Sequence, residues 1–429
     1  MKGDFLNSWL RGNDSGFMDD ISLGLERVEA VRRSMSLLLT CPVVIVGGTN
    51  GKGSVCAMLD SIFRSAGYKV GLYTSPHISS FSERVKVSGH EATREDLIKS
   101  FERVRAKQHN IRLTYFEFAT LVAVDYFSIN KVDVAILEVG MGGRLDAVNI
   151  FDRQCTILTS VGLDHVEFLG ATVDKIASEK AGIFRKNIPA VCGIKNPPES
   201  ILKKATSVGC LLSVIDKDFG YEPNSIKDWL FWDRMGKRIL LPWPSLKGKV
   251  QLNNAAVAVA AVRRMGNLLP VDLGAIRNGL VDIRLRGRLE ISTTRPQVIL
   301  DVCHNVQAAE CFATSLSEMP VVKKTVAIVG LLAKKDIKGI IGALKKTVDL
   351  WITVELKTAE TARSNDLKIV FSESGIESDS IIHMISLVRA YEVAKASVEE
   401  NDRILVFGSF FLVSEALETI ENGGSWQIN

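Results

Sequence analysis

A glycine-rich segment with one lysine is the clearest sign of chemistry in the sequence. It reads VVIVGGTNGKGS over residues 43–54, so a β-branched run, a turn and the start of a helical pattern follow one another. Glycines let backbone N–H groups approach phosphate oxygens, a helix N-terminus adds partial positive charge, and Lys52 reaches the outer phosphates. We therefore predict a nucleotide site formed by Thr49, Asn50, Gly51, Lys52, Gly53 and Ser54.

This segment departs from the general phosphate-loop pattern. The pattern has a glycine five residues before the Gly-Lys glycine and a hydroxyl residue directly after the lysine, whereas this chain has Val46 and Gly53 there. The hydroxyl comes one residue later, at Ser54. The alternative is a glycine-rich strand-to-helix turn with a surface lysine, but the order of strand, Gly-Lys and helix favours nucleotide binding.

Two further polar residues follow apolar runs. Glu138 ends the run VDVAILE, and His165 ends TSVGLDH. Open α/β sheets bind ligands at the carboxyl ends of their strands, so both side chains are candidate ligands. A carboxylate also suits a hard cation that bridges phosphates. The plainer alternative is a solvated carboxylate and a structural or surface histidine.

The elements that must position these residues alternate between strands and helices. Between residues 43 and 195, buried runs separated by amphipathic patterns predict a parallel sheet covered on both faces. We expect strands at 43–46, 69–73, 132–139 and 155–161, and helices at 94–107, 115–129 and 172–183. Residues 212–250 hold three of the six Trp and several prolines, which indicates a β-rich insertion before a helix at 251–264.

A charged joint near 285–295 precedes a second alternation. We expect strands at 297–302, 325–330, 349–354 and 403–408, and helices at 305–318, 336–347, 382–399 and 411–422. The predicted fold class is α/β, with a P-loop NTPase-like N-terminal domain of mostly parallel sheet and a smaller Rossmann-like C-terminal domain. We place these domains at 1–287 and 288–429.

Composition limits the classes of partner. The 429 residues carry 53 Lys and Arg against 49 Asp and Glu, and a net charge of +4 is too small to indicate nucleic acid. No apolar stretch approaches the roughly 18 residues of a membrane span, and the N-terminus lacks the apolar core of a signal peptide. The seven cysteines contain no CxxC pair. We therefore expect a reduced, cytoplasmic protein.

Several segments together resemble the dihydrofolate synthase/folylpolyglutamate synthase family, which is related to the Mur peptide ligases. The resemblance spans the chain and is most specific between residues 47 and 185. It rests on TNGKGS, YTSPH (73–77), TYFEF (114–118), LEVGMGGRLDAVN (137–149), LDH (163–165), SEKAGIF (178–184) and GSFFLVSEA (408–416).

The resemblance implies an ATP-dependent ligase that joins an acid to an amino acid. ATP would phosphorylate a carboxylate of dihydropteroate or of a reduced folate, and the amine of L-glutamate would displace phosphate. A carboxylate is a poor electrophile because attack must expel oxide, whereas phosphate leaves readily. The remaining task of the protein is to position reactants and neutralise charge.

The family also implies roles for individual residues. The residues expected to take part in catalysis are Lys52, His165, Lys180 and His304. Two magnesium ions are expected, with ligands from Ser75, Glu138, His165 and a Lys180 that is carbamylated by carbon dioxide. ATP contacts are expected from Asn254, Arg288 and Asp301 as well as the phosphate loop. Pteroate contacts are expected from Leu23, Gly24, Leu25, Thr114, Tyr115, Phe116, Leu145, Asp146 and Ala147.

One segment departs from the family pattern. The family usually has DGAHNP where this chain has DVCHNV, so Val302, Cys303 and Val306 change the loop around His304 and leave the role of that histidine open. Two alternatives also stay open: a Mur-type ligase acting on a cell-wall precursor, and a P-loop ATPase that makes no amide. We expect small-molecule partners only, without nucleic acid or membrane, and a monomer.

Overall fold

The computed structural model describes residues 17–18 and 22–421. They form two compact units. The first comprises the described residues up to Ser245 together with Gln251–Arg284, and the second comprises Leu246–Val250 together with those from Leu285 onward. Among the described residues, none of the helices combines the length and apolar character that a bilayer span requires.

The first unit is built on an eight-stranded sheet. Six strands are parallel and two antiparallel strands, β4 and β5, extend one edge. In spatial order the strands are β10 (Leu211–Val214), β9 (Pro189–Cys192), β8 (Cys155–Leu158), β2 (Val43–Gly47), β7 (Val134–Glu138), β3 (Val70–Tyr73), β4 (Val85–Val87) and β5 (His90–Glu91). The predicted parallel sheet is therefore confirmed.

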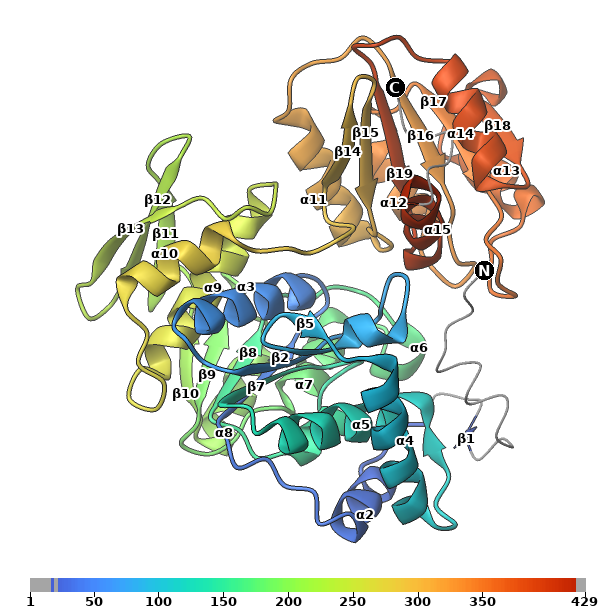
Figure 1. Cartoon of the computed structure of the whole chain (residues 1–429). Helices are drawn as coiled ribbons and strands as arrows, with labels where there is room; N and C mark the ends of the chain where they lie inside the picture. The colour runs from blue at the N-terminus through green and yellow to red at the C-terminus, as the bar shows by residue number, and fades with distance from the viewer. Residues whose placement is uncertain (1–16, 19–21, 422–429) are drawn as a thin grey trace. The chain divides into compact units, whose positions relative to one another are not determined.

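Helices cover both faces of this sheet (Figure 1). On one face α3 (Lys52–Ser65) packs against α10 (Leu273–Val281) and contacts β2, β3 and β7. The other face carries α4 (Arg94–Gln108), α5 (Tyr115–Asn130), α7 (Val173–Ala181) and α8 (Glu199–Val208). Because the central strands are covered twice, β2, β7 and β8 are buried along their whole length, which explains why most of their residues are apolar.

Further elements complete the first unit. They are β1 (Phe17–Met18), α2 (Glu26–Ser34), η1 (Phe81–Arg84), β6 (Leu113–Thr114), η2 (Ala147–Ile150), α6 (Val166–Leu169) and α9 (Val250–Arg264). A separate antiparallel sheet consists of β11 (Phe219–Pro223), β12 (Asp228–Asp233) and β13 (Arg238–Pro242), which confirms the β-rich insertion. All seven cysteines are free thiols, and Cys155 and Cys192 are buried as expected.

The second unit has a six-stranded sheet in which only β14 runs antiparallel. Its spatial order is β14 (Glu290–Thr294), β15 (Gln297–Asp301), β19 (Arg403–Phe407), β16 (Thr325–Val329), β17 (Leu350–Val354) and β18 (Ile381–Met384). The helices are α11 (Val306–Ser317), α12 (Ile337–Leu344), α13 (Ser364–Glu373), α14 (Leu387–Ala396) and α15 (Phe410–Glu421), and a short η3 (Ser378–Ser380) precedes β18.

One expected helix was wrong at its start. Residues 382–384 were assigned to a helix but belong to β18, which pairs in parallel with β17. The isoleucines of this strand are β-branched and pack well on a pleated surface, and Ser386 then caps the true helix α14 by accepting the N–H of Arg389.

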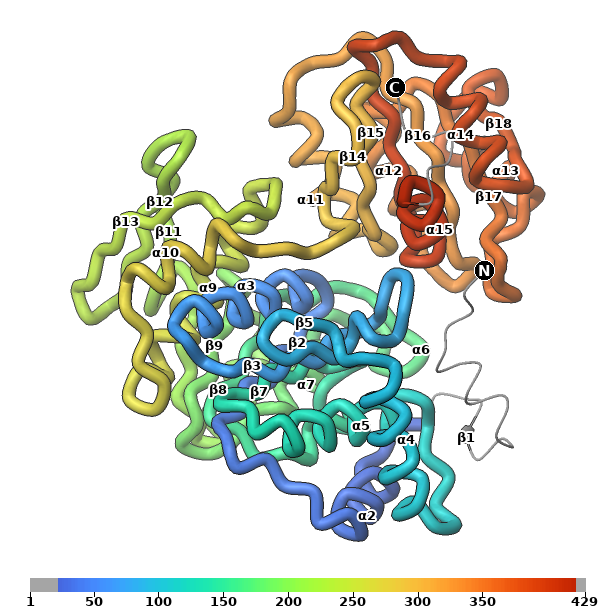
Figure 2. Tube along the Cα trace, in the orientation of Figure 1, coloured from blue at the N-terminus to red at the C-terminus, as the bar shows by residue number. Residues whose placement is uncertain are grey.

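The strand order brings distant segments to one edge of the first sheet. β2 lies between β7 and β8, although both follow it much later in the chain (Figure 2). Because the three strands are parallel, the segments that leave their carboxyl ends meet at the same edge. These segments are the phosphate loop after β2, Glu138 at the end of β7 and residues 159–165 after β8.

Candidate active site

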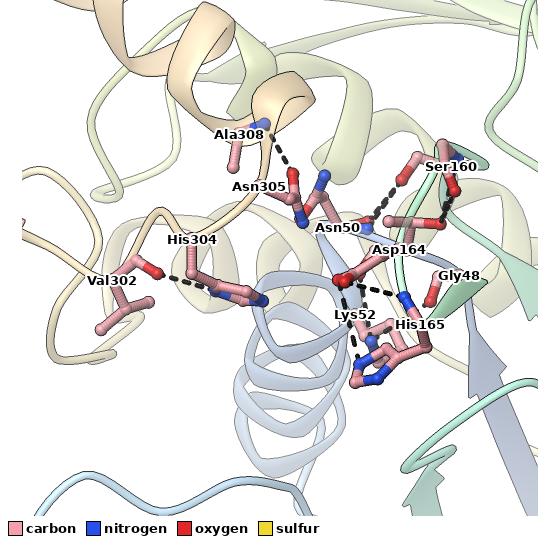
Figure 3. A network of polar contacts seen from close by, with 12 residues as sticks. Gly48, Asn50, Lys52, Ser160, Asp164, His165, Val302, His304, Asn305 and Ala308 are labelled. Atoms are coloured by element: carbon pink, nitrogen blue, oxygen red, sulfur yellow. Dashed lines mark hydrogen bonds and ion pairs between the residues drawn. The ribbon is translucent and has the colours of Figure 1, made fainter. Parts of the chain in front are cut away.

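The phosphate loop has the local geometry that its glycines allow. Gly48 has φ +147 and Gly51 has φ +86, both in the region that side chains rarely adopt, and Gly51 leads directly into α3. Lys52 folds back over the loop, where its ammonium donates to the carbonyl oxygens of Gly48 and Thr49, each at 3.2 Å (Figure 3). The loop therefore presents a helix N-terminus and a lysine at one place.

Residues just after β8 brace this loop. The hydroxyl of Thr159 donates to the carbonyl of Asn50 at 2.6 Å, and the hydroxyl of Ser160 accepts the Asn50 N–H at 2.8 Å (Figure 3). Thr49 donates its backbone N–H to the Ser160 carbonyl at 2.9 Å. The Thr49 hydroxyl also accepts the N–H of Gly162 at 3.0 Å. These bonds hold the loop against the neighbouring strand instead of leaving its shape to the glycines alone.

Glu138 lies at the end of β7 with only 3% of its surface exposed. Its Oε2 accepts the backbone N–H of Ser75 at 3.1 Å, so the structure brings together two of the residues expected to bind metal. A Cβ placed on Gly53 would meet only Glu138 Oε2, at 3.9 Å. The carboxylate thus lies beside the first turn of α3, and this donor chemistry fits a divalent cation.

Lys180 is buried although it carries an ammonium group. It lies in the last turn of α7, has 5% of its surface exposed, and donates to the Gly48 carbonyl at 2.9 Å. Burial, and then the charge of Lys52, lower the pKa of Lys180 to about 7, while Asp164 and Asp146 oppose that shift. The amine of Lys180 therefore loses its proton far more readily than a surface lysine.

His165 lies on the loop that follows β8 and begins α6. Its backbone has φ 50, and its side chain is 41% exposed with Nε2 at 3.9 Å from Asp164 Oδ2 (Figure 3). It follows the segment that braces the phosphate loop, which places it at the expected sheet edge. Within residues 22–421, no group of three or more His, Cys, Asp and Glu side chains is arranged to hold a metal ion.

The segments expected to contact pteroate are joined by an ion pair. Thr114 caps α5 by accepting the Glu117 N–H at 3.2 Å, and Glu117 accepts the Thr114 N–H at 2.7 Å. The same Glu117 pairs with Arg27 of α2 at 3.0 Å. Arg27 lies two residues beyond Leu25, so the segment of Leu23, Gly24 and Leu25 is tied to the start of α5.

Phe116 faces the turn that follows β7. A Cβ on Gly140 would lie 2.6 Å from the Phe116 ring, so only glycine lets the turn approach this closely. In the same turn Asp146 accepts the N–H groups of Met141 at 2.9 Å and Val148 at 3.1 Å. Burial raises the pKa of Asp146 to about 7 against these bonds. Leu145 and Ala147 flank it, so the expected pteroate residues of this turn lie beside a buried carboxyl whose pKa is raised.

Asn254 of α9 lies beside the phosphate loop. Its Oδ1 would be 2.7 Å from a Cβ on Gly51, and its amide donates to Gln251 Oε1 at 2.9 Å. The structure therefore places this expected ATP contact at the start of α3, within the first unit.

In the second unit, the three expected residues gather at the end of β15. Asp301 accepts the N–H groups of Leu289 and Cys303, both at 2.8 Å, and burial raises its pKa although Arg288 opposes the shift. The Arg288 guanidinium lies 5.5 Å from the ring centre of Phe410. His304 lies 5.7 Å from the same ring and donates from Nδ1 to the Val302 carbonyl at 2.9 Å (Figure 3).

Sequence reasoning missed residues that act through others. Thr159, Ser160, Glu117 and Phe410 were not among the candidates, although they hold candidate residues in place. The sequence pattern that could have indicated Thr159 and Ser160 is a pair of hydroxyl residues directly after an apolar run. The partner of Glu117 is 90 positions away in the chain, and no local pattern indicates such a pair.

Comparisons with known proteins identify the family of this chain. The Mur ligase middle domain matches residues 46–262, and the Mur ligase glutamate ligase domain matches 287–410. The dihydrofolate synthase/folylpolyglutamate synthase of Escherichia coli K12 is 39% identical over 417 residues, covering 97% of this chain and 96% of that protein. The folylpolyglutamate synthase of Lacticaseibacillus casei is 30% identical and covers 89% and 90%.

Solved structures give the same result. E. coli FolC in complex with DHPP and ADP superposes with a TM-score of 0.91 at 38% identity, covering 97% of this chain and 98% of that one. A bifunctional folylpolyglutamate synthase/dihydrofolate synthase with Mn, AMPPNP and L-glutamate bound has a TM-score of 0.89 at 35% identity, with the same coverage. The chain belongs to the dihydrofolate synthase/folylpolyglutamate synthase family of Mur ligases.

Proposed function

We propose that this chain is an ATP-dependent ligase that joins L-glutamate to dihydropteroate, to the γ-carboxylate of reduced folates, or to both. The product is an amide, and ADP and phosphate are released. The observation that carries the proposal is the braced phosphate loop, which contacts Lys180 and faces Glu138 across the first turn of α3. Relatives that bind ADP, AMPPNP and L-glutamate support this assignment.

The residues divide the work of acyl-phosphate formation. Lys52 and the N-terminal end of α3 bind and orient the phosphates of ATP, with Asn254 beside the loop. The pteroate is bound by Thr114, Phe116 and the turn that holds Asp146. Because these residues are held in place, they orient the acceptor carboxylate for attack on the terminal phosphate. The amine of glutamate then attacks the acyl phosphate, and phosphate leaves.

Ser75, Glu138 and His165 are the residues that would hold magnesium. A bound divalent cation neutralises phosphate charge during transfer, and a relative with Mn and AMPPNP bound supports its presence. We propose two ions, the second with a carbamylated Lys180 as a ligand. The buried Glu138 carboxylate supports the first assignment, since it lies beside the phosphate loop at the first turn of α3 and accepts the Ser75 N–H.

Carbamylation of Lys180 balances simply. The ammonium first gives up one proton; the neutral amine then attacks carbon dioxide, a C–N bond forms, and a second proton leaves, so a cation becomes an anion. Burial beside Lys52 supports this step because it favours the neutral amine.

We expect Lys180→Ala to lose nearly all ligase activity while ADP still binds. Full activity in that variant would refute the role, and intact-protein mass spectrometry should detect one added carbon dioxide in the wild type.

The two predicted domains are proposed to have separate tasks. Residues 1–287 would bind ATP and the pteroate, and residues 288–429 would supply glutamate and, through Arg288, Asp301 and His304, contacts to ATP. His304 donates through Nδ1, so its Nε2 is the acceptor of the neutral ring. We also propose a monomer acting on small molecules, which sedimentation velocity tests directly.

A coupled ADP-release assay tests the function. It compares dihydropteroate and tetrahydrofolate, each with and without glutamate, and mass spectrometry identifies the amide. ADP release that needs both acceptor and glutamate supports the proposal. Activity with UDP-linked cell-wall precursors and none with pteroates would instead assign a Mur peptide ligase. ADP release that needs neither, without amide, would assign a simple ATPase.

A further inference from the structure

One carboxylate accepts several backbone N–H groups from the segment that carries Ser75. This segment, residues 74–80, follows β3 and is called here the Ser75 loop. Glu83 accepts three consecutive backbone N–H groups from it: Ile78 at 2.8 Å on Oε2, and Ser79 at 2.7 Å and Ser80 at 2.8 Å on Oε1. Both oxygens of the Glu83 side chain are thereby committed to the loop.

This arrangement exceeds what the adjacent helix requires. The short helix η1 has a capping box, in which Glu83 accepts the N–H of Ser80. A capping box uses one such bond. The bonds from Ile78 and Ser79 lie before the helix and satisfy donors that belong to the loop. Bonds to an ionised carboxylate are also stronger than neutral ones, so Glu83 fixes the loop more firmly than a helix cap alone.

The rest of the loop is held by other partners. The Thr74 N–H donates to the Arg84 carbonyl at 3.0 Å, and the Ser75 N–H donates to Glu138 at 3.1 Å. The Arg84 side chain donates from Nε to His77 Nδ1 at 2.7 Å, and its guanidinium lies 5.2 Å from the ring centre of Tyr115. The loop is therefore attached at both ends and in its middle, and Ser75 is held beside Glu138.

We propose that Glu83 is a positioning residue of the ligation reaction. It acts on the reacting groups only through the Ser75 loop, by holding Ser75 against Glu138 beside the phosphate loop. The inference rests on the proposed function in one respect: Ser75 and Glu138 are taken as the magnesium ligands. The three bonds from the loop backbone to Glu83 are called here the clamp. When the clamp is weakened, magnesium binds less tightly, but the same site forms when enough magnesium is supplied.

The variant Glu83→Gln tests the clamp with the least change of shape. Its amide group keeps one oxygen acceptor and replaces the other with an N–H donor, which cannot accept from the loop. The matched control is Glu91→Gln on the adjoining β4–β5 hairpin. Its side chain accepts from the Ser82 hydroxyl at 3.2 Å and pairs with Lys86 at 3.6 Å, so the control removes the same charge and leaves the three bonds from the loop backbone to Glu83 in place.

Hydrogen–deuterium exchange gives a readout that needs no catalysis. We expect amides in the peptide covering residues 77–81 to exchange about tenfold faster in Glu83→Gln, because one charge-assisted bond is lost, and at the wild-type rate in Glu91→Gln. Unchanged exchange in Glu83→Gln would overturn the clamp. If that variant does not fold, Glu83→Asp keeps the charge on a shorter side chain and is measured in the same way.

Magnesium titration of ADP release tests the positioning role. In Glu83→Gln the magnesium concentration for half-maximal rate should rise about tenfold, while the rate at saturating magnesium stays within about twofold of wild type. A merely structural role would lower the amount of active enzyme without shifting this midpoint, and that result would refute the proposal. If the wild type shows no acceptor-dependent ADP release, the proposed function fails, and the exchange experiment still decides the clamp.

Discussion

Gly48 gives the sharpest prediction for the phosphate loop. The variant Gly48→Ala places a methyl group on a residue with φ +147, and the new Cβ would lie 2.0 Å from Thr159 Oγ1. Real Cβ atoms are not found closer than 3.0 Å, so the atoms must separate by about 1 Å. Thr159 cannot simply rotate away, because its hydroxyl donates to the Asn50 carbonyl at 2.6 Å.

Two costs add in this variant. The unfavourable backbone conformation costs about 1–3 kcal/mol, and overpacking against a buried side chain costs about 1–3 kcal/mol more. The loop relieves both by leaving its braced shape, so the cost falls on nucleotide binding. We expect ADP affinity to fall by at least about thirtyfold, which is the lower end of that sum.

Isothermal titration with ADP measures the effect, and Gly67→Ala is the matched control. Gly67 also has positive φ, +89, but a Cβ there meets nothing within 4 Å, so it has the backbone cost without the collision. The double variant Gly48→Ala/Thr159→Ala should recover at least about 1 kcal/mol relative to additivity, because the colliding oxygen is gone. Wild-type ADP affinity in Gly48→Ala, or strict additivity in the double variant, would refute the reasoning.

Three other predictions concern the first unit. Asp146 has a folded pKa of about 7, above its unfolded value of 3.8, so its contribution to stability is complete below pH 4 and is lost as pH rises to 7. From pH 5 to 7 this loss is about 2 kcal/mol, and urea unfolding should show a flatter pH dependence in Asp146→Asn. Thr114→Ala should lower the free energy of unfolding by about 1 kcal/mol through loss of the cap, whereas Thr114→Ser should be close to wild type in the same titration. Gly140→Ala places a Cβ 2.6 Å from the Phe116 ring and should raise the KM for the pteroate about tenfold or more; an unchanged KM for ATP is the internal check.

Much of the fold follows from local patterns in the sequence. The strands β2, β7 and β8 are mostly apolar because helices cover both faces, and their runs of apolar residues indicate that burial directly. The helices α4 and α5 begin directly after Thr93 and Thr114, whose side chains cap them, so their starts are well defined. Such signals lie within a few residues of the element that they predict.

What sequence reasoning missed depends on pairing between distant segments. The edge strands β4 and β5 are short and become strands through their neighbours. Residues 381–384 carry an apolar run that fits a helix or a strand, and β17 decides between them. In the site, the glycines and Lys52 indicated a phosphate loop, but the Thr159 and Ser160 brace requires β8 to lie beside β2, which no local pattern states.

The brace on the phosphate loop has a consequence for synthesis of the chain. Asn50 is made early, but its partners Thr159 and Ser160 emerge from the ribosome about 110 positions later, and Asn254 beside Gly51 later still. A nascent chain therefore contains the complete glycine-rich motif long before the motif has its working shape. Fragments that end before residue 159 should contain the glycine-rich motif but fail to bind nucleotide. In the cell, ATP therefore binds only when the first unit is nearly complete.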